Sequence, residues 1–247
     1  MLTWEDLKKA ELGRTFDVKE LQNCCRATYG SIAWPGKKPG FAVVLAMSRR
    51  KENDSDSHEI CLLDECEHSD LRELIVQCRR LDAKWEPELW FGDTNNDAAE
   101  EFIYEMNANA NAQWFDPAAR KFNLVPTCLL YPEPMQEMYS YILGTLKGLL
   151  GERQRRLFLK DGIIKNYLDQ IKPDEVAELK RGDYPAIEAL GYAVVEMLHL
   201  VKHAGHLPSH TGDDSMYPDE GEFDHLLRPG ATAVSYTHLT LPTILLV

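Results

Sequence analysis

The sequence predicts an α/β fold in which one mixed β-sheet is covered by helices on both faces. Three strand-like segments follow one another between residues 27 and 65 with only turns and a loop between them, which is typical of an antiparallel meander. From residue 71 onward, amphipathic helices alternate with short apolar strands. Strands that alternate with helices are usually parallel, so the two patterns together predict a mixed sheet with both faces covered.

The meander is expected from residues 27–34, 41–47 and 59–65. Its first segment, ATYGSIAW, is rich in residues that favour strands, and the turn signal PGKKPG follows it at once. The second segment, FAVVLAM, is a continuous apolar run of strand length. The third segment, EICLLDE, comes after a polar, acidic loop and ends in Asp64 and Glu65. Such closely spaced strands favour antiparallel pairing.

The remainder of the domain is expected to be mainly helical. The apolar residues at positions 71, 74, 75, 78 and 81 follow the i, i+3, i+4, i+7 rule, which predicts an amphipathic helix. Further helices are expected at residues 98–106, 138–149, 163–171 and 187–201, the last beginning after Pro185. Short strands are expected at residues 89–93, 124–130 and 156–160, and a polar loop at residues 107–113.

The composition fits one well-buried domain with additional terminal segments. The chain has 247 residues, of which 44% are hydrophobic and 27% are charged, and this length is enough for a single core. We expect a charged helical arm at residues 1–26, the α/β domain at 27–204, a disordered tail at 205–233 and a separate segment at 234–247. No apolar run reaches the roughly 18 residues that span a bilayer, and the first residues are charged where a signal peptide is apolar. A cytoplasmic location without a membrane partner is therefore expected.

Residues 234–243 read VSYTHLTLPT, which resembles one reading frame of the transposon-end adapter used in sequencing libraries. The other interpretation is a genuine short strand with an apolar end. We expect residues 234–247 to be an adapter-derived, non-native tail, and fold reasoning leaves them out as it would leave out an expression scar.

The net charge of −13 argues against a surface that binds nucleic acid by neutralising phosphates. It is compatible with a nuclease whose carboxylates hold metal ions that meet the phosphate. The six cysteines include no CxxC pair, so a zinc knuckle or a disulfide framework is not expected. Four histidines, His199, His203, His206 and His210, lack the glutamate of an HExxH motif, which favours a surface cluster over a zinc site.

Three segments resemble the RNase H-like nuclease domain of tailed-phage terminase large subunits. The first is SIAWPG at residues 31–36, followed by the apolar strand GFAVV; terminase nucleases have a strand ending Asp-Pro-Gly here, and Trp34 stands in the place of the first metal-binding aspartate. The second is WFGDTN at residues 90–95, where the family's fourth strand ends in an acid. The third is EALGYA at residues 188–193, preceded by Asp183, where the family has a helix with a motif like Asp-Ala-Leu-x-Tyr-Ala.

The resemblance implies an RNase H-like fold and metal-dependent cleavage of double-stranded DNA during phage genome packaging, in the cytoplasm of a bacterial host cell. It also implies Mg²⁺ or Mn²⁺ as cofactor. No GxxxxGK[ST] loop is found in the sequence, so a separate packaging ATPase or portal protein is the expected protein partner. The loss of the first-strand acid leaves an alternative open, which is a catalytically inactive RNase H-like structural or protein-interaction module of a phage.

Asp93, Glu188 and Asp183 are the candidate catalytic and metal-binding residues. Two-metal cleavage of a phosphodiester needs several carboxylates that converge from different elements, and the resemblance places Asp93 and Glu188 at one edge of the sheet. Each residue also has a structural interpretation: Asp93 can open a turn, Glu188 can interact with a helix dipole, and Asp183 can cap the helix that starts at Pro185. Asp97 is a possible fourth ligand, and Asp64 or Glu65 a possible substitute for the lost acid.

Overall fold

The predicted meander forms the centre of the sheet. In the computed structural model, strands β1 (Cys25–Ala33), β2 (Gly40–Ser48) and β3 (Ile60–His68) pair in antiparallel order. Every residue of β2 is buried, as expected for an apolar strand that is covered on both faces. The structure describes residues 2–48, 58–112, 124–126, 135–151, 155–172 and 176–203.

Parallel strands extend the meander on both sides. Strand β4 (Leu89–Gly92) pairs in parallel with β1, and β5 (Leu124–Pro126) pairs in parallel with β4. The short strand β6 (Leu157–Phe158) pairs in parallel with β3 at the other edge. The resulting order is β5-β4-β1-β2-β3-β6. A three-stranded meander that two parallel strands extend beyond its first strand is the arrangement of the RNase H-like fold, so the predicted fold class is confirmed.

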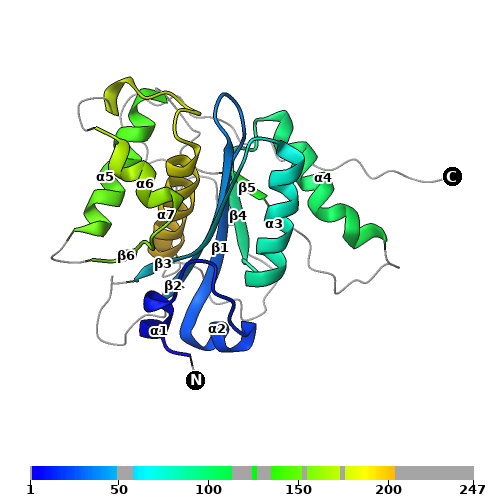
Figure 1. Ribbon diagram of the computed structural model, residues 1–247, viewed down its shortest axis with the longest axis vertical. Coiled ribbons are helices and arrows are strands. Elements are labelled where there is room, and N and C mark those ends of the chain that lie inside the picture. Colours follow the sequence, from blue (N-terminus) through cyan, green and yellow to red (C-terminus); the bar gives the residue numbers. More distant parts are fainter. Residues whose placement is uncertain are drawn as a thin grey trace, which may run out of the picture. The chain divides into compact units, whose positions relative to one another are not determined.

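Three helices cover one face of the sheet (Figure 1). They are α5 (Met135–Leu150), α6 (Ile163–Gln170) and α7 (Pro185–His203). Helix α7 lies across β1 and β2, and its residues Ile187, Leu190 and Val194 are fully buried. Together with the strand side chains beneath them, the apolar residues of this face form the α7-side core.

Helices α3 (Leu71–Trp85) and α4 (Asp97–Ala112) cover the opposite face (Figure 1). The predicted apolar stripe of α3 is buried except at Leu71, which is partly buried, and Trp85 and the strand residue Trp90 are buried too. These side chains form the α3-side core. Because successive strand residues point to opposite faces, β1 contributes Ile32 to the α3-side core and Ala33 to the α7-side core.

Helix α4 is longer than its sequence predicts, because it continues to Ala112 through the segment expected to be a polar loop. The segment alternates asparagine with alanine, and alanine has the highest intrinsic helix propensity. The asparagine at the start of the segment is accommodated within the helix, since Asn107 Nδ2 donates to the carbonyl oxygen of Ile103 at 2.9 Å. Asparagine was taken as a loop signal here, and that prediction was wrong.

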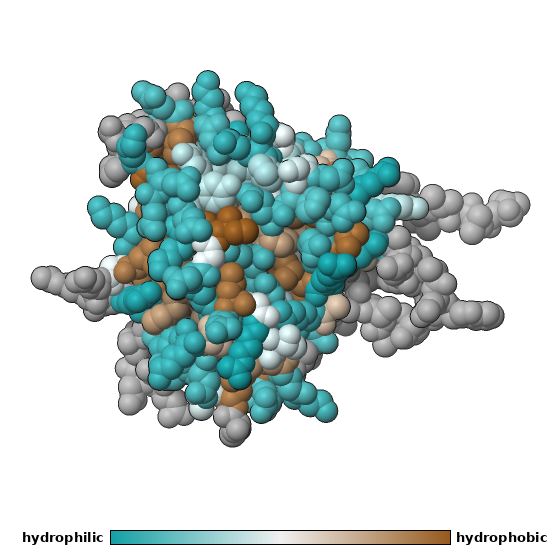
Figure 2. Space-filling model, viewed as in Figure 1, coloured by the Kyte–Doolittle hydropathy of each residue, from teal (hydrophilic) through white to brown (hydrophobic). Residues whose placement is uncertain are grey.

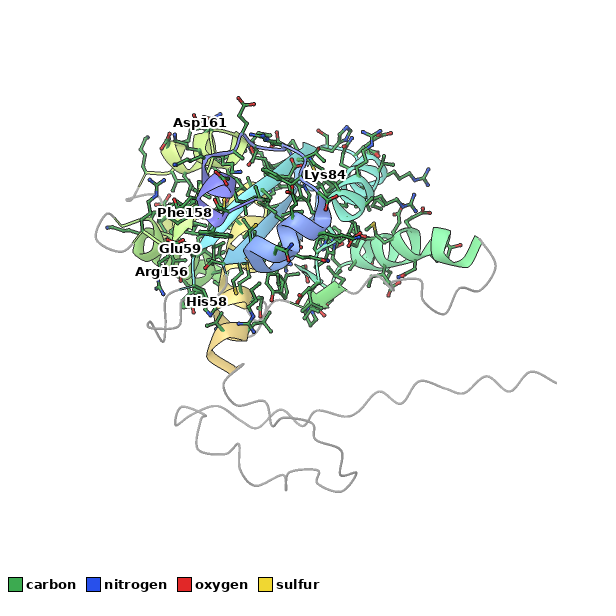
Figure 3. All side chains as sticks on the ribbon, turned by 90° about the horizontal axis from the view of Figure 1, so that it is seen from below. His58, Glu59, Lys84, Arg156, Phe158 and Asp161 are labelled. Carbon is green, nitrogen blue, oxygen red and sulfur yellow. The ribbon has the colours of Figure 1, made fainter. Side chains whose placement is uncertain are left out.

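Two short helices occupy the N-terminal arm, α1 (Trp4–Lys9) and α2 (Val18–Cys24). Helix α1 has a reciprocal capping box between Thr3 and Asp6, which satisfies two of its free backbone amides. Its Leu7 is fully buried in the α3-side core. Polar contacts hold the same helix near β3 and β6, where Glu59 and Phe158 lie (Figure 3): Trp4 Nε1 donates to Glu59 at 2.5 Å, and Lys8 stands over the Phe158 ring.

Several expected features lie outside the described residues. They include residues 127–130 of the strand expected at 124–130, His206 and His210 of the histidine cluster, and the tail segments 205–233 and 234–247. None of the helices in the described part of the chain has the length and apolar character needed to traverse a lipid bilayer. The face shown in Figure 2 is mostly hydrophilic, with small apolar patches among the polar side chains.

Candidate acidic site

Asp93 follows β4 directly and is almost completely buried, with 4% of its surface exposed. It lies two residues after Phe91, whose ring belongs to the α7-side core. One carboxylate oxygen, Oδ1, accepts a hydrogen bond from the backbone N–H of Asn95 at 2.9 Å, which forms the turn expected of an aspartate at a strand end. The other oxygen, Oδ2, forms an ion pair with Arg181.

Glu188 lies in the first turn of α7 and is 3% exposed. Its Oε1 accepts hydrogen bonds from Tyr139 Oη and from the backbone N–H of Gly182, both at 2.5 Å. Its Oε2 accepts from Tyr192 Oη at 3.3 Å. Burial, and after it the charge of Glu188, raises the pKa of both tyrosines. Both phenols therefore remain protonated donors at neutral pH, and the carboxylate keeps its hydrogen bonds.

Asp183 closes a tight turn at residues 180–183, here called the arginine turn. Its Oδ2 accepts from the backbone N–H of Lys180 at 2.6 Å, and its own N–H donates to the carbonyl oxygen of Lys180 at 3.0 Å. Gly182 has a φ of +85°, a conformation that favours glycine. The first amides of α7 donate to the carbonyl oxygen of Tyr184. Asp183 thus points back into the turn, and the interpretation of this residue as a helix cap was wrong.

The three predicted acids meet at the arginine turn. Asp183 closes it, Glu188 accepts from its Gly182 N–H, and Asp93 pairs with its Arg181 side chain. Arg181 also acts on the Tyr192 hydroxyl, whose pKa its charge lowers against the larger effect of burial, and that hydroxyl donates to Glu188. The structure therefore brings Asp93, Glu188 and Asp183 together, with a guanidinium group among them.

The acids that surround Arg181 do not fit a two-ion metal site. Carboxylate oxygens are suitable donors for Mg²⁺ or Mn²⁺, but both oxygens of Asp93 and both of Glu188 already accept a hydrogen bond or an ion pair. In the parts of the chain that the structure describes, no three histidine, cysteine, aspartate or glutamate side chains are grouped so that they could hold a metal ion. Asp97 begins α4, where an acid interacts favourably with the helix dipole.

Asp64 and Glu65 support the scaffold and do not replace the first-strand acid. Asp64 Oδ2 forms an ion pair with Lys84 at 2.9 Å and accepts from Trp85 Nε1 at 3.0 Å, which ties β3 to the end of α3. Glu65 accepts from the backbone amides of Ile163 and Ile164 at the start of α6. Both acids therefore have partners outside the acidic site, and neither is the substitute for the first-strand acid that the sequence left possible.

The contacts of Glu65 predict a pH-dependent stability. Burial raises the pKa of Glu65 more than its two backbone hydrogen bonds lower it, so folding favours the protonated acid. The stability that this residue contributes is complete below its unfolded pKa and is lost as the pH rises through its higher folded pKa. Between pH 4 and pH 7 we expect the free energy of unfolding of wild type to fall by up to about 1 kcal/mol relative to that of Glu65→Gln. The change is limited to this size because Glu65 is partly exposed and solvent screens its charge. Urea unfolding of both proteins at the two pH values measures this difference, and parallel pH profiles would contradict the prediction.

Trp34 does not lie where the motif alignment places it. Its ring packs on Phe102 of α4, with centroids 5.3 Å apart, and it belongs to the α3-side core. Its Nε1 donates to the main-chain carbonyl oxygen of Asp93 at 2.7 Å. The side chain therefore supports Asp93 from the opposite face of the sheet. On the face that carries Glu188, the last residue of β1 is Ala33.

Three functional side chains were missed from the sequence: Arg181, Tyr139 and Tyr192. Tyr192 follows Glu188 by four residues on one helix, and this spacing places the two on the same side of α7, so a local signal was present. Arg181 and Tyr139 reach the site only through the tertiary fold, and no spacing in the sequence indicates that they lie beside Asp93 and Glu188. The RGD triplet at residues 181–183 signals a turn, but it does not indicate that Arg181 pairs with Asp93.

The fold and these residues define an RNase H-like α/β module with a buried acidic site. No family model and no curated protein matches the sequence. Two of the solved structures that are similar to this chain are viral proteins. The crystal structure of Fowlpox virus resolvase with its substrate Holliday junction DNA is 8% identical with a TM-score of 0.41, over 70% of this chain and 98% of that chain. The large terminase nuclease of the thermophilic phage G20c is 11% identical with a TM-score of 0.42, over 68% of this chain and 82% of that chain. At these values the likeness concerns the fold alone.

Proposed function

We propose that this chain is a terminase-like DNA endonuclease module of phage genome packaging, with Asp93 and Glu188 as its acidic centre and Asp183 as a supporting acid. One observation supports this proposal. Two carboxylates from distant parts of the sequence are buried against the same turn, where β4 ends and α7 begins. Burying a charged carboxylate is costly, and such acids concentrate at functional sites.

The substrate of this proposed endonuclease is double-stranded DNA, and its protein partner is a separate packaging ATPase or portal protein. A net charge of −13 opposes a broad DNA-binding surface, so contact with the phosphates is local. Asp93 and Glu188 would be the residues to hold Mg²⁺ or Mn²⁺, and a bound ion would activate water and stabilise the leaving oxygen. Because the acids do not fit two ions as they stand, we expect cleavage in Mg²⁺ to be very slow or absent.

A second candidate is a catalytically inactive RNase H-like module that serves assembly. It is favoured by the ion pair between Arg181 and Asp93 and by the position of Trp34 on the opposite face from Glu188. The two candidates differ in one respect that can be measured, namely whether any divalent-metal-dependent nicking depends on Asp93.

Plasmid nicking by the purified chain in Mg²⁺, Mn²⁺ and EDTA tests the proposal. We expect slow nicking, strongest in Mn²⁺, that Asp93→Asn abolishes because it removes the acid at the end of β4. The matched control is Asp161→Asn, since the Asp161 side chain is 93% exposed and pairs only with its helix neighbour Lys165. The control is expected to nick at the wild-type rate. Nicking that persists in Asp93→Asn, or a complete absence of nicking in Mn²⁺, would refute the proposed endonuclease.

A further inference from the structure

The acidic site contains a cation that belongs to the protein. Arg181 pairs with Asp93, and its charge acts on the Tyr192 hydroxyl that donates to Glu188, so the guanidinium group connects the environments of the two candidate acids. The Asp93 side chain is 6% exposed and that of Arg181 is 26% exposed. A guanidinium group remains charged at every accessible pH, so it compensates the buried carboxylate at all times.

The surrounding residues hold Arg181 in this place. The Gly182 amide next to it is fixed by Glu188, and the turn is closed by Asp183. Glu188 is fixed in turn by Tyr139, whose hydroxyl oxygen accepts from the backbone N–H of Tyr184 at 2.9 Å. The arginine turn is therefore held by hydrogen bonds on both sides of Arg181, and the predicted metal ligands contribute to that support.

We infer that Arg181 is the resident cation of the acidic site and that it excludes a divalent ion as long as it is paired with Asp93. The inference rests on the proposed function for the identity of the site. It explains why acids that match a metal-binding motif do not form a metal site: the position between them already carries a positive charge. Arg181 and a divalent ion compete for Asp93 Oδ2, so removal of the guanidinium charge makes this oxygen available to an ion.

The test compares wild type with Arg181→Gln, which keeps a polar side chain, although a shorter one, and removes its charge. In EDTA the variant leaves Asp93 buried without a cation, and we expect its Tm to fall by several degrees. Addition of Mn²⁺ is expected to raise the Tm of Arg181→Gln, since ligand binding to the folded state stabilises it, and to leave the Tm of wild type unchanged. Isothermal titration is expected to give at least tenfold tighter Mn²⁺ binding by the variant.

Three further variants separate charge from structure. Lys180→Gln removes the exposed neighbouring charge and is expected to bind Mn²⁺ as wild type does. Arg181→Lys keeps the charge and is also expected to bind Mn²⁺ as weakly as wild type. Arg181→Gln combined with Asp93→Asn is expected to recover Tm in EDTA and to lose the response to Mn²⁺. If Arg181→Gln does not fold in EDTA, recovery of its far-UV circular dichroism in Mn²⁺ is measured instead.

The inference is overturned if Arg181→Gln binds Mn²⁺ no more tightly than wild type does, or no more tightly than Arg181→Lys does. It is also overturned if Arg181→Gln is unfolded in EDTA and Mn²⁺ does not restore its fold. The proposed function fails in a different way. If Arg181→Gln gains Mn²⁺ affinity but wild type never nicks DNA, the inference stands and the endonuclease proposal falls. If wild type nicks DNA through Asp93 and Arg181→Gln gains no affinity, the endonuclease proposal stands and the inference falls.

Discussion

Replacement of Glu188 by alanine is expected to lower the free energy of unfolding by about 3 kcal/mol or more. The carboxylate accepts hydrogen bonds from the hydroxyls of Tyr139 and Tyr192 and from the backbone N–H of Gly182. Alanine leaves these three donors without their acceptor at a buried position, and each unsatisfied group costs about 1–3 kcal/mol. The loss also releases the arginine turn from α7.

Urea unfolding at pH 7 measures the effect, with two matched variants. Glu188→Gln keeps one oxygen acceptor and is expected to lose about half as much stability. Tyr192→Phe removes only the hydroxyl at 3.3 Å and is expected to lose about 1 kcal/mol. The informative opposite outcome is an alanine variant that is more stable than wild type, which would show that Glu188 is retained at a cost to stability, as acids kept for function often are.

The fold was predictable because its signals are local. The turn signal PGKKPG and the apolar run FAVVLAM lie next to each other in the sequence, and together they predict β2 and the turn before it. The same local reasoning failed at the end of α4, where asparagine was read as a loop residue although alanine alternates with it. The first of these asparagines is accommodated within the helix, where Asn107 donates to the carbonyl oxygen of Ile103.

The acidic site was predictable only in part. Asp93 at a strand end and Glu188 at a helix start occupy positions that a motif can specify, and the structure brings them to one turn. Their partners could not be found in this way, because Arg181 pairs with a residue far away in the sequence and Tyr139 belongs to another helix. The chemistry of a buried carboxylate depends on exactly these partners, so the motif indicated where the acids lie but not what they bind.

The alignment of Trp34 with the first metal-binding aspartate shows a second limit of motif reasoning. Motifs match residues by their order in the sequence, whereas a strand divides them between two faces. Trp34 belongs to the α3-side core and Ala33 to the α7-side core. A shift of one residue therefore moves a carboxylate from one face of the sheet to the other, and an acid facing Glu188 belongs at position 33.

This division of faces allows a paired comparison. Ala33→Asp introduces a carboxylate on the face of α7, and Trp34→Asp introduces one on the face of α3 and α4. Both variants carry the same added charge at neighbouring positions, and they differ in the face that receives the charge and in the indole that Trp34→Asp removes. Because Arg181 pairs with Asp93 in the wild type, both substitutions are made in Arg181→Gln, and we expect Mn²⁺ binding, measured by isothermal titration, to increase further only with Ala33→Asp. The control for the indole is Trp34→Phe, which keeps an aromatic ring beside Phe102, although a smaller one, and loses the hydrogen bond to Asp93.

Trp34→Asp is expected to lower the free energy of unfolding by about 3–5 kcal/mol without strengthening Mn²⁺ binding. The indole is 9% exposed, packs against Phe102 and donates to the Asp93 carbonyl oxygen at 2.7 Å. A small acid leaves a cavity in that core and places a charge among apolar side chains. Trp34→Phe is expected to lose about 1 kcal/mol, the usual value of one hydrogen bond, so urea unfolding of the two variants separates packing from the polar contact. The contradicting result is a folded Trp34→Asp variant that binds Mn²⁺ more tightly than wild type does. It would mean that the new carboxylate reaches Asp93 and Glu188 around the end of β1, and that position 34 is the place of the missing acid after all.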